Sequence, residues 1–355
     1  MNDALFLKQA LELADTRKGF CAPNPAVGAV VVQDGKIVSQ GVHQKAGSPH
    51  AEVEALNGLQ DAENTTVYVT LEPCCHWGKT PPCTDLLIQK KVSRVVYGLM
   101  DPNPLVRGRG QASLEQAGIS CQWFQLPEIE KFYRGYSHWV THEKTPYVTA
   151  KLAVTLDGKI AGAQGERKQI TGPELEKFTH EHRRRSDALL TTVETILCDD
   201  PRLDVRIDSE VLQKPLYVLD TFMRLPEKAR VFDTAQSITL FHGADVPQTR
   251  LHLLEDKGVR LVPVQKEELG LNLLDVVKEI GQAGCHELWV ECGGTCIWAL
   301  VRKKLLGRVF IYVAPKWMGK DGKAAFGEDA WDLANGSKSV QWSSRGKDAL
   351  CEIEW

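Results

Sequence analysis

The first 120 residues alternate short apolar runs with segments that are apolar on one helical face. Runs rich in β-branched residues predict strands, and the 3.6-residue patterns predict helices. The expected strands are 27–32, 65–71 and 94–99, and the expected helices are 49–59 and 81–91. A further helix is expected at the N-terminus, with Leu5, Leu7, Leu11 and Ala14 facing inward. This alternation indicates a layered α/β domain.

The pattern changes after a polar helix predicted over Pro127–Thr141, and we expect a domain boundary at His142–Pro146. Beyond it, runs rich in β-branched and aromatic residues alternate with helices, which indicates a second α/β domain with a largely parallel sheet. The expected strands there are 147–154, 215–220, 286–291 and 308–315. We therefore predict two domains, 1–145 and 146–355. No Gly-x-Gly-x-x-Gly follows the first strand, so the usual Rossmann fingerprint is absent.

The 355 residues are 43% hydrophobic and carry a formal net charge of −3, as expected of a globular protein. Residues 1–145 hold 14 basic and 15 acidic side chains, which leaves 29 and 31 for the rest, so neither half offers a cationic surface for nucleic acid. The apolar runs are far shorter than the ~20 residues that span a bilayer. The N-terminus does not resemble a signal peptide. We expect a cytoplasmic protein without membrane or nucleic-acid partners.

Ten cysteines in such a chain are better explained by a reducing compartment than by disulfides. Cys74, Cys75 and Cys83 cluster in the sequence, whereas most of the others are scattered and are expected to be small buried hydrophobes. Only the cluster requires a chemical explanation.

Histidine and cysteine are placed where a metal site could form. Ser48 is suited to cap the helix that follows, which puts His50 and Glu52 in its opening turn. Cys83 falls in the first turn of the next helix, and Cys74 ends the loop after a strand. One histidine and two cysteines form a three-ligand set for zinc (Zn²⁺) and leave the fourth position open for water. Glu52 is then placed to transfer protons as the catalytic residue.

His-Ala-Glu followed by Pro-Cys is the signature of zinc deaminases that act on nucleobases. Here the second cysteine follows Cys74 after nine positions, not three, because HWGKTPP lengthens the loop. Each residue alone has a simpler interpretation, as a helix cap or a buried side chain. Cys75 could also take the metal, although in an extended segment its side chain should point away from that of Cys74.

Several runs resemble the deaminase half of the bifunctional deaminase-reductases of riboflavin biosynthesis. They are NPAVGAVVV at 24–32, HAEVEAL at 50–56, LEPCCHWGKTPPC at 71–83 and DPNPLVRGRG at 101–110. The resemblance implies a cytidine-deaminase-like three-layer domain and a phosphoribosylated diaminopyrimidine substrate. The substrate contacts it implies are Asn24, His43, His76, Lys79, Asp101 and Asn103. Simpler interpretations stay open for His43, as a solvated loop residue, and for Asp101, as a turn residue.

The second half is similar to the reductase half of the same family, through AKLAVTLDGKIA, ITG, TILCDDPRLDVR, LDT and VECGGT. The resemblance implies a dihydrofolate-reductase-like fold that uses NADPH to reduce a ribosyl group to an open ribityl chain. The cofactor positions it implies are Ala153, Gln169, Thr195, Asp199, Thr221, Gly293, Gly294 and Thr295. The substrate positions it implies are Arg167, Arg183, Leu203, Arg206 and Glu291.

Local chemistry leaves alternatives at several of these positions. The glycine pair before the last long helix could receive a phosphate on free amides or could form only a tight turn. Of the consecutive arginines 183–185, at most one faces a given pocket, and we choose Arg183. Asp199 and Lys151 both adjoin sequences typical of turns. Many relatives have tryptophan in place of Gln169 and a small polar residue in place of Arg167, so the reductase contacts are in doubt there.

The leading hypothesis is a bifunctional enzyme that deaminates a phosphoribosylated pyrimidine and then reduces its sugar, acting as a homo-oligomer, either a dimer or a tetramer. Two alternatives remain. One is a nucleic-acid-editing deaminase with an accessory domain, and the other is a nucleotide-sensing protein with a decayed reductase half.

Overall fold

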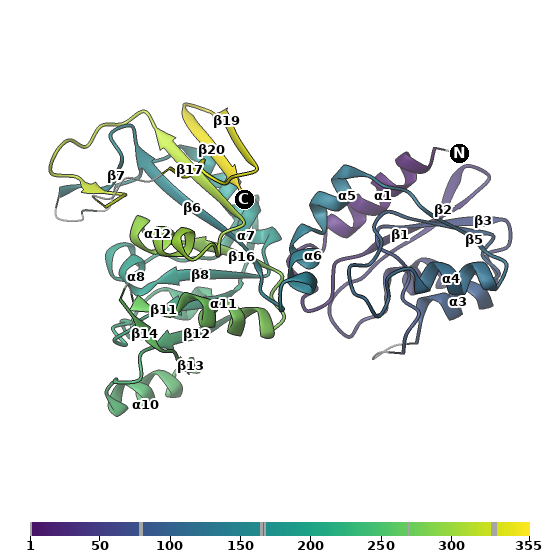
Figure 1. The fold of residues 1–355 in the computed structure, drawn as a ribbon, viewed down its shortest axis with the longest axis horizontal. Helices are drawn as coiled ribbons and strands as arrows, with labels where there is room; N and C mark the ends of the chain where they lie inside the picture. Colours follow the sequence, from purple (N-terminus) through teal and green to yellow (C-terminus); the bar gives the residue numbers. More distant parts are fainter. Residues whose placement is uncertain (1, 78–80, 164–165, 167, 269, 328–331) are drawn as a thin grey trace. The chain divides into compact units, whose positions relative to one another are not determined.

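The computed structural model describes residues 2–77, 81–163, 166, 168–268, 270–327 and 332–355 (Figure 1). The chain separates into two compact units, Met1–Lys144 and Thr145–Trp355. Among the described residues, no helix combines the length and the apolar character needed to cross a membrane.

The first unit is built around one sheet with the strand order β2-β1-β3-β4-β5. Its elements are α1 Asp3–Asp15, β1 Gly28–Gln33, β2 Lys36–Val42, α2 Ala51–Leu56, β3 Thr65–Val69, α3 Cys83–Gln89, β4 Arg94–Tyr97, α4 Arg109–Gln116, β5 Ser120–Trp123, α5 Pro127–Phe132 and α6 Arg134–Thr141. β1 pairs antiparallel with β2 and β3, whereas β3, β4 and β5 run parallel.

Alternation along the buried strands divides this unit into three layers. Val30 and Val32 of β1 pack with α1 and α5, whereas Ala29 and Val31 pack with α2, α3 and α4 on the opposite face. Successive strand residues point to opposite faces, so both faces of the sheet are covered by apolar side chains. The predicted α/β layering of this domain is therefore confirmed.

Two details of the helices differ from the predictions. Leu5 is 48% exposed, and Phe6 and Ala10 are buried in its place beside Leu7. Leu5 and Leu7 are two residues apart, about 200° around a helix, so both cannot face the core. The helix predicted over Pro127–Thr141 is broken at Tyr133, whose buried hydroxyl donates to the Ala26 carbonyl oxygen at 2.8 Å.

The second unit contains a sheet with the strand order β13-β12-β11-β8-β16-β6-β17-β20-β19 among its described residues. Its elements are β6 Tyr147–Thr155, β7 Lys159–Ala161, α7 Pro173–Arg185, β8 Ala188–Thr192, α8 Val193–Asp199, β9 Val205–Ile207, β10 Glu210–Leu212, β11 Pro215–Leu219, α9 Val231–Thr234, β12 Ser237–His242, α10 Gln248–Asp256, β13 Arg260–Pro263, β14 Lys266–Glu267, β15 Gly270–Leu271, α11 Leu273–Gln282, β16 Glu287–Glu291, α12 Gly294–Arg302, β17 Arg308–Ala314, β18 Lys323–Ala324, β19 Ser339–Arg345 and β20 Asp348–Glu354.

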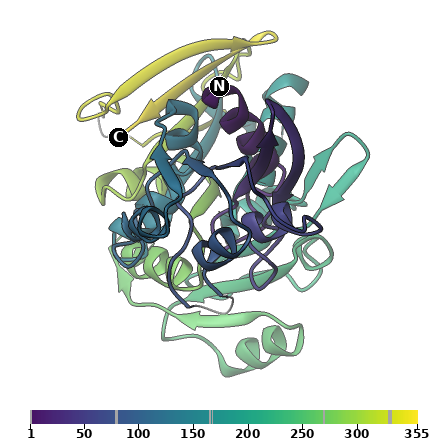
Figure 2. The same cartoon turned by 90° about the vertical axis from the view of Figure 1, so that its right-hand side faces the viewer.

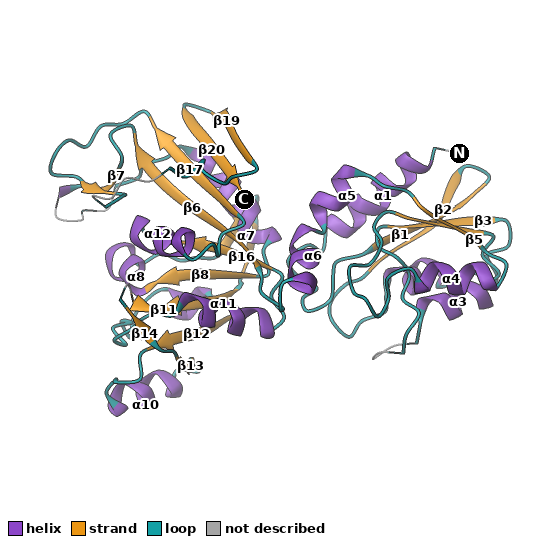
Figure 3. Cartoon of the chain, viewed as in Figure 1, coloured by secondary structure: helices purple, strands orange, loops and turns teal. Residues whose placement is uncertain are grey.

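The strands from β13 to β17 run parallel, and β20 and β19 add an antiparallel hairpin at one edge (Figures 2 and 3). Val290 packs with α11 and α12 on one face of the sheet, and Trp289 packs with α7, α8 and α10 on the other. The predicted second α/β domain with a largely parallel sheet is confirmed.

The packing of α2 against β2 leaves no room for a side chain at Gly41. A Cβ there would lie 2.3 Å from the Ala51 carbonyl oxygen and 2.3 Å from the Ala55 nitrogen. We predict that Gly41→Ala lowers the free energy of unfolding of the first unit by about 1–3 kcal/mol, because the helix must move away from the strand. Chemical unfolding followed by circular dichroism measures this. Gly327→Ala is the control, since a Cβ at Gly327 meets no atom of the described residues within 4 Å. Equal stability of both variants would contradict the prediction.

Candidate active sites

One imidazole and two thiols of the first unit meet at the ends of three segments. The Nδ1 atom of His50 lies 3.1 Å from Sγ of Cys83 and 3.5 Å from Sγ of Cys74. All three donor atoms lie within 4.8 Å of one another. The backbone N–H of Cys83 also donates to Sγ of Cys74 at 3.3 Å. The neighbouring Cys75, which the structure also describes, does not join this cluster.

The local structure that places these ligands differs in part from the prediction. Ser48 does not cap α2, because its hydroxyl group closes a turn with Lys45, whose carbonyl oxygen accepts at 2.6 Å. The helix begins at Ala51, so His50 is itself the N-cap residue and lies just before the first turn. Cys83 lies in the first turn of α3, as the sequence predicts, although the helix begins at Cys83 and not at residue 81.

The donor set fits a zinc ion. The hydrogen bond from Cys83 lowers the pKa of Cys74 to about 4, whereas the same contact raises the pKa of Cys83. The two thiols adjoin one another and an imidazole, and a divalent cation would allow both to bind as thiolates. Three protein ligands leave a tetrahedral ion one open position, as in catalytic rather than structural zinc sites.

Glu52 lies in the first turn of α2 and is buried beside this cluster. Its burial, followed by the nearby Cys74 thiolate, raises the pKa of its carboxyl group to about 7. It also forms a side-chain hydrogen bond with Cys83. The structure therefore brings the predicted proton carrier to the predicted metal ligands.

Asn24 and His43 lie together next to the metal cluster. Nδ2 of Asn24 is 3.2 Å from Nε2 of His43, and Nδ1 of His43 is 2.9 Å from the Pro49 carbonyl oxygen. The His43 ring meets the His50 ring edge-on, with centroids 5.6 Å apart. Because His43 is buried, its pKa is lowered. It is therefore not a solvated loop residue, which was the simpler interpretation.

Asp101 and Asn103 form a tight turn whose carboxylate is buried. Oδ1 of Asp101 accepts from the backbone N–H of Asn103 at 2.8 Å and from the Tyr136 hydroxyl at 3.2 Å. Burial raises the pKa of Asp101 to about 6. Tyr136 is not identifiable from the sequence, because its only signal is its place in a helix. His76 is exposed, and Lys79 lies outside the described residues.

A cavity of about 720 Å³ occupies the second unit, where several parallel strands end and α8 and α12 begin. Ligands of open α/β sheets bind at such edges. All of the predicted cofactor and substrate residues that the structure describes in this unit line the cavity. They are Ala153, Gln169, Thr195, Asp199, Thr221, Gly293, Gly294, Thr295, Arg183, Leu203, Arg206 and Glu291. The remaining one, Arg167, lies outside the described residues.

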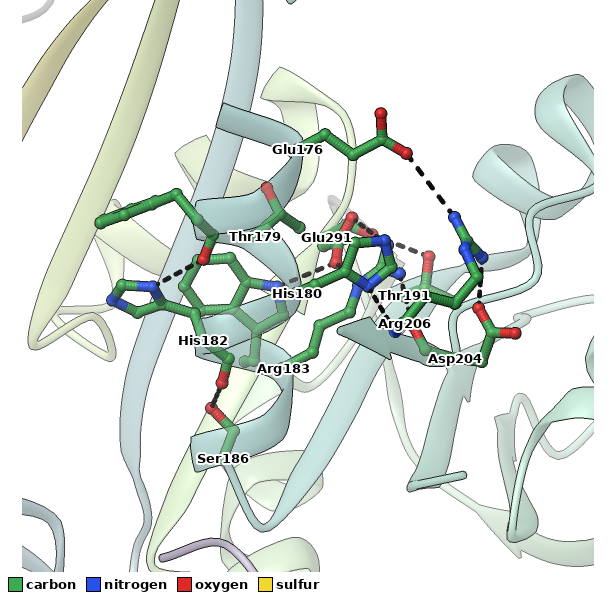
Figure 4. Close-up of polar contacts among 12 residues, drawn as sticks. Glu176, Thr179, His180, His182, Arg183, Ser186, Thr191, Asp204, Arg206 and Glu291 are labelled. Atoms are coloured by element: carbon green, nitrogen blue, oxygen red, sulfur yellow. Dashed lines mark hydrogen bonds and ion pairs between the residues drawn. The ribbon is translucent and has the colours of Figure 1, made fainter. Parts of the chain in front are cut away.

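A buried ion pair forms part of the cavity wall. Nε of Arg183 donates to Oε1 of Glu291 at 2.5 Å, and a second bond to Oε2 measures 2.9 Å (Figure 4). Arg183 also donates to the Asp204 carbonyl oxygen, and Trp289 donates to Oε1 of Glu291 at 2.9 Å. Burial alone would raise the pKa of Glu291, but Arg183 outweighs it and holds that pKa at about 2. Arg183 is therefore the arginine of 183–185 that faces the pocket.

Arg206 extends its charge toward the same cavity. Its guanidinium group hydrogen-bonds to the buried Asp204 and lies 3.7 Å from Glu176 (Figure 4). Its backbone N–H donates to Nδ1 of His180 at 3.0 Å. The Arg206 side chain remains 41% exposed, so its outer face is accessible to an anion.

The glycine pair opens α12 as predicted, with Gly293 as the N-cap. A Cβ on Gly294 would lie 1.5 Å from the Ala325 carbonyl oxygen, so only glycine fits there. The residues of this first turn line the cavity, where a helix N-terminus favours a phosphate.

Lys151, which falls within the expected strand 147–154, also lines the cavity. It lies within β6, with Nζ 5.3 Å from the centre of the Tyr312 ring. Desolvation lowers its pKa, although the charge of Glu291 acts in the opposite direction. The available signal was a lysine in the middle of an apolar strand, where a buried charge is unusual.

Known families match both halves of the chain. Residues 1–99 match the cytidine and deoxycytidylate deaminase zinc-binding region, and residues 146–348 match the RibD C-terminal domain. The chain is 39% identical over 324 residues to the riboflavin biosynthesis protein RibD of Aquifex aeolicus, covering 90% of this chain and 88% of that protein. It is 37% identical over 337 residues to the Escherichia coli protein of that name, covering 91% and 90%.

Solved structures extend the likeness to both units. Acinetobacter baumannii RibD superposes with a TM-score of 0.87 at 33% identity, covering 99% of this chain and 98% of that one. A diaminohydroxyphosphoribosylaminopyrimidine deaminase/5-amino-6-(5-phosphoribosylamino)uracil reductase of Thermotoga maritima gives 0.83 at 31% identity, with the same coverage. The predicted resemblance to the deaminase-reductases and the cytidine-deaminase-like first domain are confirmed.

We predict that Cys74→Ala and Cys83→Ala each abolish tight zinc binding, because two ligands hold a tetrahedral ion too weakly. Cys75→Ala is the matched control and should keep about one zinc per chain. Plasma mass spectrometry of the purified proteins measures the metal. Loss of zinc from the Cys75 variant alone would reassign the ligand set.

The Arg183–Glu291 pair predicts a specific response to acid. Because the folded pKa of Glu291 lies below its usual 4.5, the pair stabilises the fold above pH 4.5 and loses this effect as the pH falls toward 2. Glu291→Gln should destabilise the second unit by about 3–5 kcal/mol at pH 7, since Arg183 keeps a buried charge without its partner. It should also flatten the acid dependence measured by chemical unfolding between about pH 2 and 7.

The control for this prediction is Glu352→Gln, which breaks a comparable ion pair that does not line the cavity. In that pair, Nη1 of Arg308 lies 3.3 Å from Oε1 of Glu352. We expect a smaller loss of stability there, because this pair is held by a longer bond. An acid dependence unchanged in Glu291→Gln would show that Glu291 is not the group responsible.

Proposed function

The chain belongs to the RibD family of riboflavin biosynthesis proteins, and from this premise we propose how its two units carry out two successive reactions. The first unit deaminates 2,5-diamino-6-(5-phosphoribosylamino)pyrimidin-4-one by hydrolysis. The second reduces the ribosyl group of 5-amino-6-(5-phosphoribosylamino)uracil to ribityl. The observation that carries this function is the coverage of both domains by deaminase-reductase relatives, together with a His-Cys-Cys cluster in one unit and a cavity in the other.

In the first reaction, water replaces the ring amino group and ammonia leaves. Zinc, held by His50, Cys74 and Cys83, would supply a Lewis acid that makes water a nucleophile near neutral pH. Glu52 accepts the proton of the attacking water and returns protons to the departing amino group, as a general base and then a general acid. Its burial against Cys83 supports this role.

The other polar residues of the first unit would hold the substrate. Asn24 and His43 adjoin the metal cluster and are proposed to contact the pyrimidine. Asp101 and Asn103 are proposed contacts from the neighbouring turn. His76 and Lys79 remain predicted contacts from the long loop.

In the second reaction, NADPH would supply the hydride that reduces the sugar. The amides at Gly293, Gly294 and Thr295 are proposed to bind a cofactor phosphate at the N-terminus of α12. Arg206, with an exposed guanidinium face, is proposed to bind the substrate phosphate. Arg183 is fixed by Glu291 and by the Asp204 carbonyl oxygen, and it is proposed to contact the substrate where it lines the cavity.

Neither alternative hypothesis gains support from a specific observation. A nucleic-acid editor would need a cationic surface, and the charges of both halves are nearly balanced. A homo-oligomeric state, either dimer or tetramer, and a cytoplasmic location remain predictions.

Mass spectrometry of the purified protein with zinc and the diaminopyrimidine substrate tests the proposal. We expect ammonia release without NADPH, and a gain of two hydrogens by the product only when NADPH is added. Glu52→Gln should lower deamination roughly 10²–10⁴-fold while zinc content and reduction of added uracil intermediate stay unchanged. Absence of deamination in zinc-loaded wild-type protein would overturn the first assignment. Absence of reduction would overturn the second.

A further inference from the structure

Glu72 is a buried carboxylate to which the mechanism above gives no task. It lies in the loop after β3, two residues before Cys74, and is 3% exposed. Its Oε2 atom accepts from the backbone N–H groups of Asp101 at 3.2 Å and Gly108 at 3.0 Å. Its Oε1 atom accepts from those of Gly110 at 3.1 Å and Gln111 at 3.4 Å. A single side chain therefore holds four amides of one distant segment.

The segment is shaped to approach this carboxylate closely. Gly108 has φ +73°, a left-handed conformation that glycine adopts without strain. A Cβ on Gly110 would lie 2.1 Å from the Pro73 carbonyl oxygen and 3.2 Å from Oε1 of Glu72. The backbone of residues 101–111 thus packs directly on the backbone that leads into the metal ligand Cys74.

The same segment carries the polar turn of the first site. The backbone N–H of Asp101 is bound to Glu72, while its Oδ1 atom is bound to Asn103 and Tyr136. Asp101 is therefore held on both sides, and Glu72 provides the only one of these contacts that comes from the metal-ligand loop. A change at Glu72 would move Asp101 relative to the metal cluster without removing a metal ligand.

We propose that Glu72 is a positioning residue for the deamination, which fixes the segment 101–111 and hence Asp101 at a set place relative to the metal ligands. The inference rests on the proposed function, because Asp101 matters only if it contacts the pyrimidine substrate. An ionised carboxylate is the side chain suited to this task, since it accepts on both oxygens. Glutamine has the same shape, but its amide would direct N–H donors at two of the four N–H groups.

The test compares Glu72→Gln with a variant that weakens the same unit elsewhere. Asp3 accepts from both terminal nitrogens of Arg94 at 3.0 and 2.9 Å, away from the metal cluster. Asp3→Asn therefore breaks a charge pair without touching the segment 101–111. For each variant we would measure kcat and KM for deamination, zinc content, the unfolding midpoint, and hydrogen exchange of the amides in residues 101–111.

We expect Glu72→Gln to raise the KM for deamination and to lower kcat/KM roughly 10–100-fold, because a substrate-contacting turn is displaced. Zinc content and the reductase reaction should stay at wild-type values, and the amides of 101–111 should exchange faster. Asp3→Asn should lower the unfolding midpoint and leave KM and those amides unchanged. An unaltered KM in Glu72→Gln, or an equal rise in Asp3→Asn, would overturn the proposal.

Two further measurements keep the outcomes separate. If Glu72→Gln does not fold, Gly110→Ala displaces the same segment from Pro73 while keeping the carboxylate, and the same rise in KM is expected. An unchanged KM in that variant would overturn the proposal. A wild-type protein that loads zinc but does not deaminate would instead refute the proposed function. Faster amide exchange alone, with normal KM, would reduce Glu72 to a structural role.

Discussion

A carboxylate removed from water needs donors from the protein, because its lost hydration is otherwise uncompensated. Each unit of this chain organises its site around one such group. In the first unit, Glu72 takes four backbone amides. In the second, Glu291 takes the guanidinium group of Arg183 and the indole N–H of Trp289. These satisfied charges fix segments that are far apart in the sequence, and the chemistry is arranged around them.

The two buried carboxylates differ in the kind of partner that they hold. The amides around Glu72 belong to the main chain, so that carboxylate defines the path of a loop. The partners of Glu291 are side chains on α7 and β16, so that carboxylate defines the orientation of a cation on a cavity wall. The first arrangement suits a site that must place a turn beside metal ligands. The second suits a cavity wall that must keep a buried cation in one orientation.

The sequence predicts most of this organisation wherever the residue types follow a recognisable pattern or spacing along the chain. The strand patterns locate both sheets, and His50, Cys74 and Cys83 are identifiable because their spacing matches a known ligand set. Where tertiary packing decides, the sequence is insufficient. Ser48 has the composition of a helix cap, yet its hydroxyl group closes a turn instead. Tyr136 enters the first site only because α5 and α6 bend at Tyr133, which no local pattern signals.

The hydrogen bonds from Pro49 through His43 to Asn24 have a direction. A carbonyl oxygen can only accept, so Nδ1 of His43 carries the proton, and Nε2 of the neutral ring must accept from the Asn24 amide. The orientation of that amide is then fixed, and its oxygen remains to accept from another group. The backbone oxygen of one proline thereby decides which atom of the Asn24 amide acts as the donor beside the metal cluster.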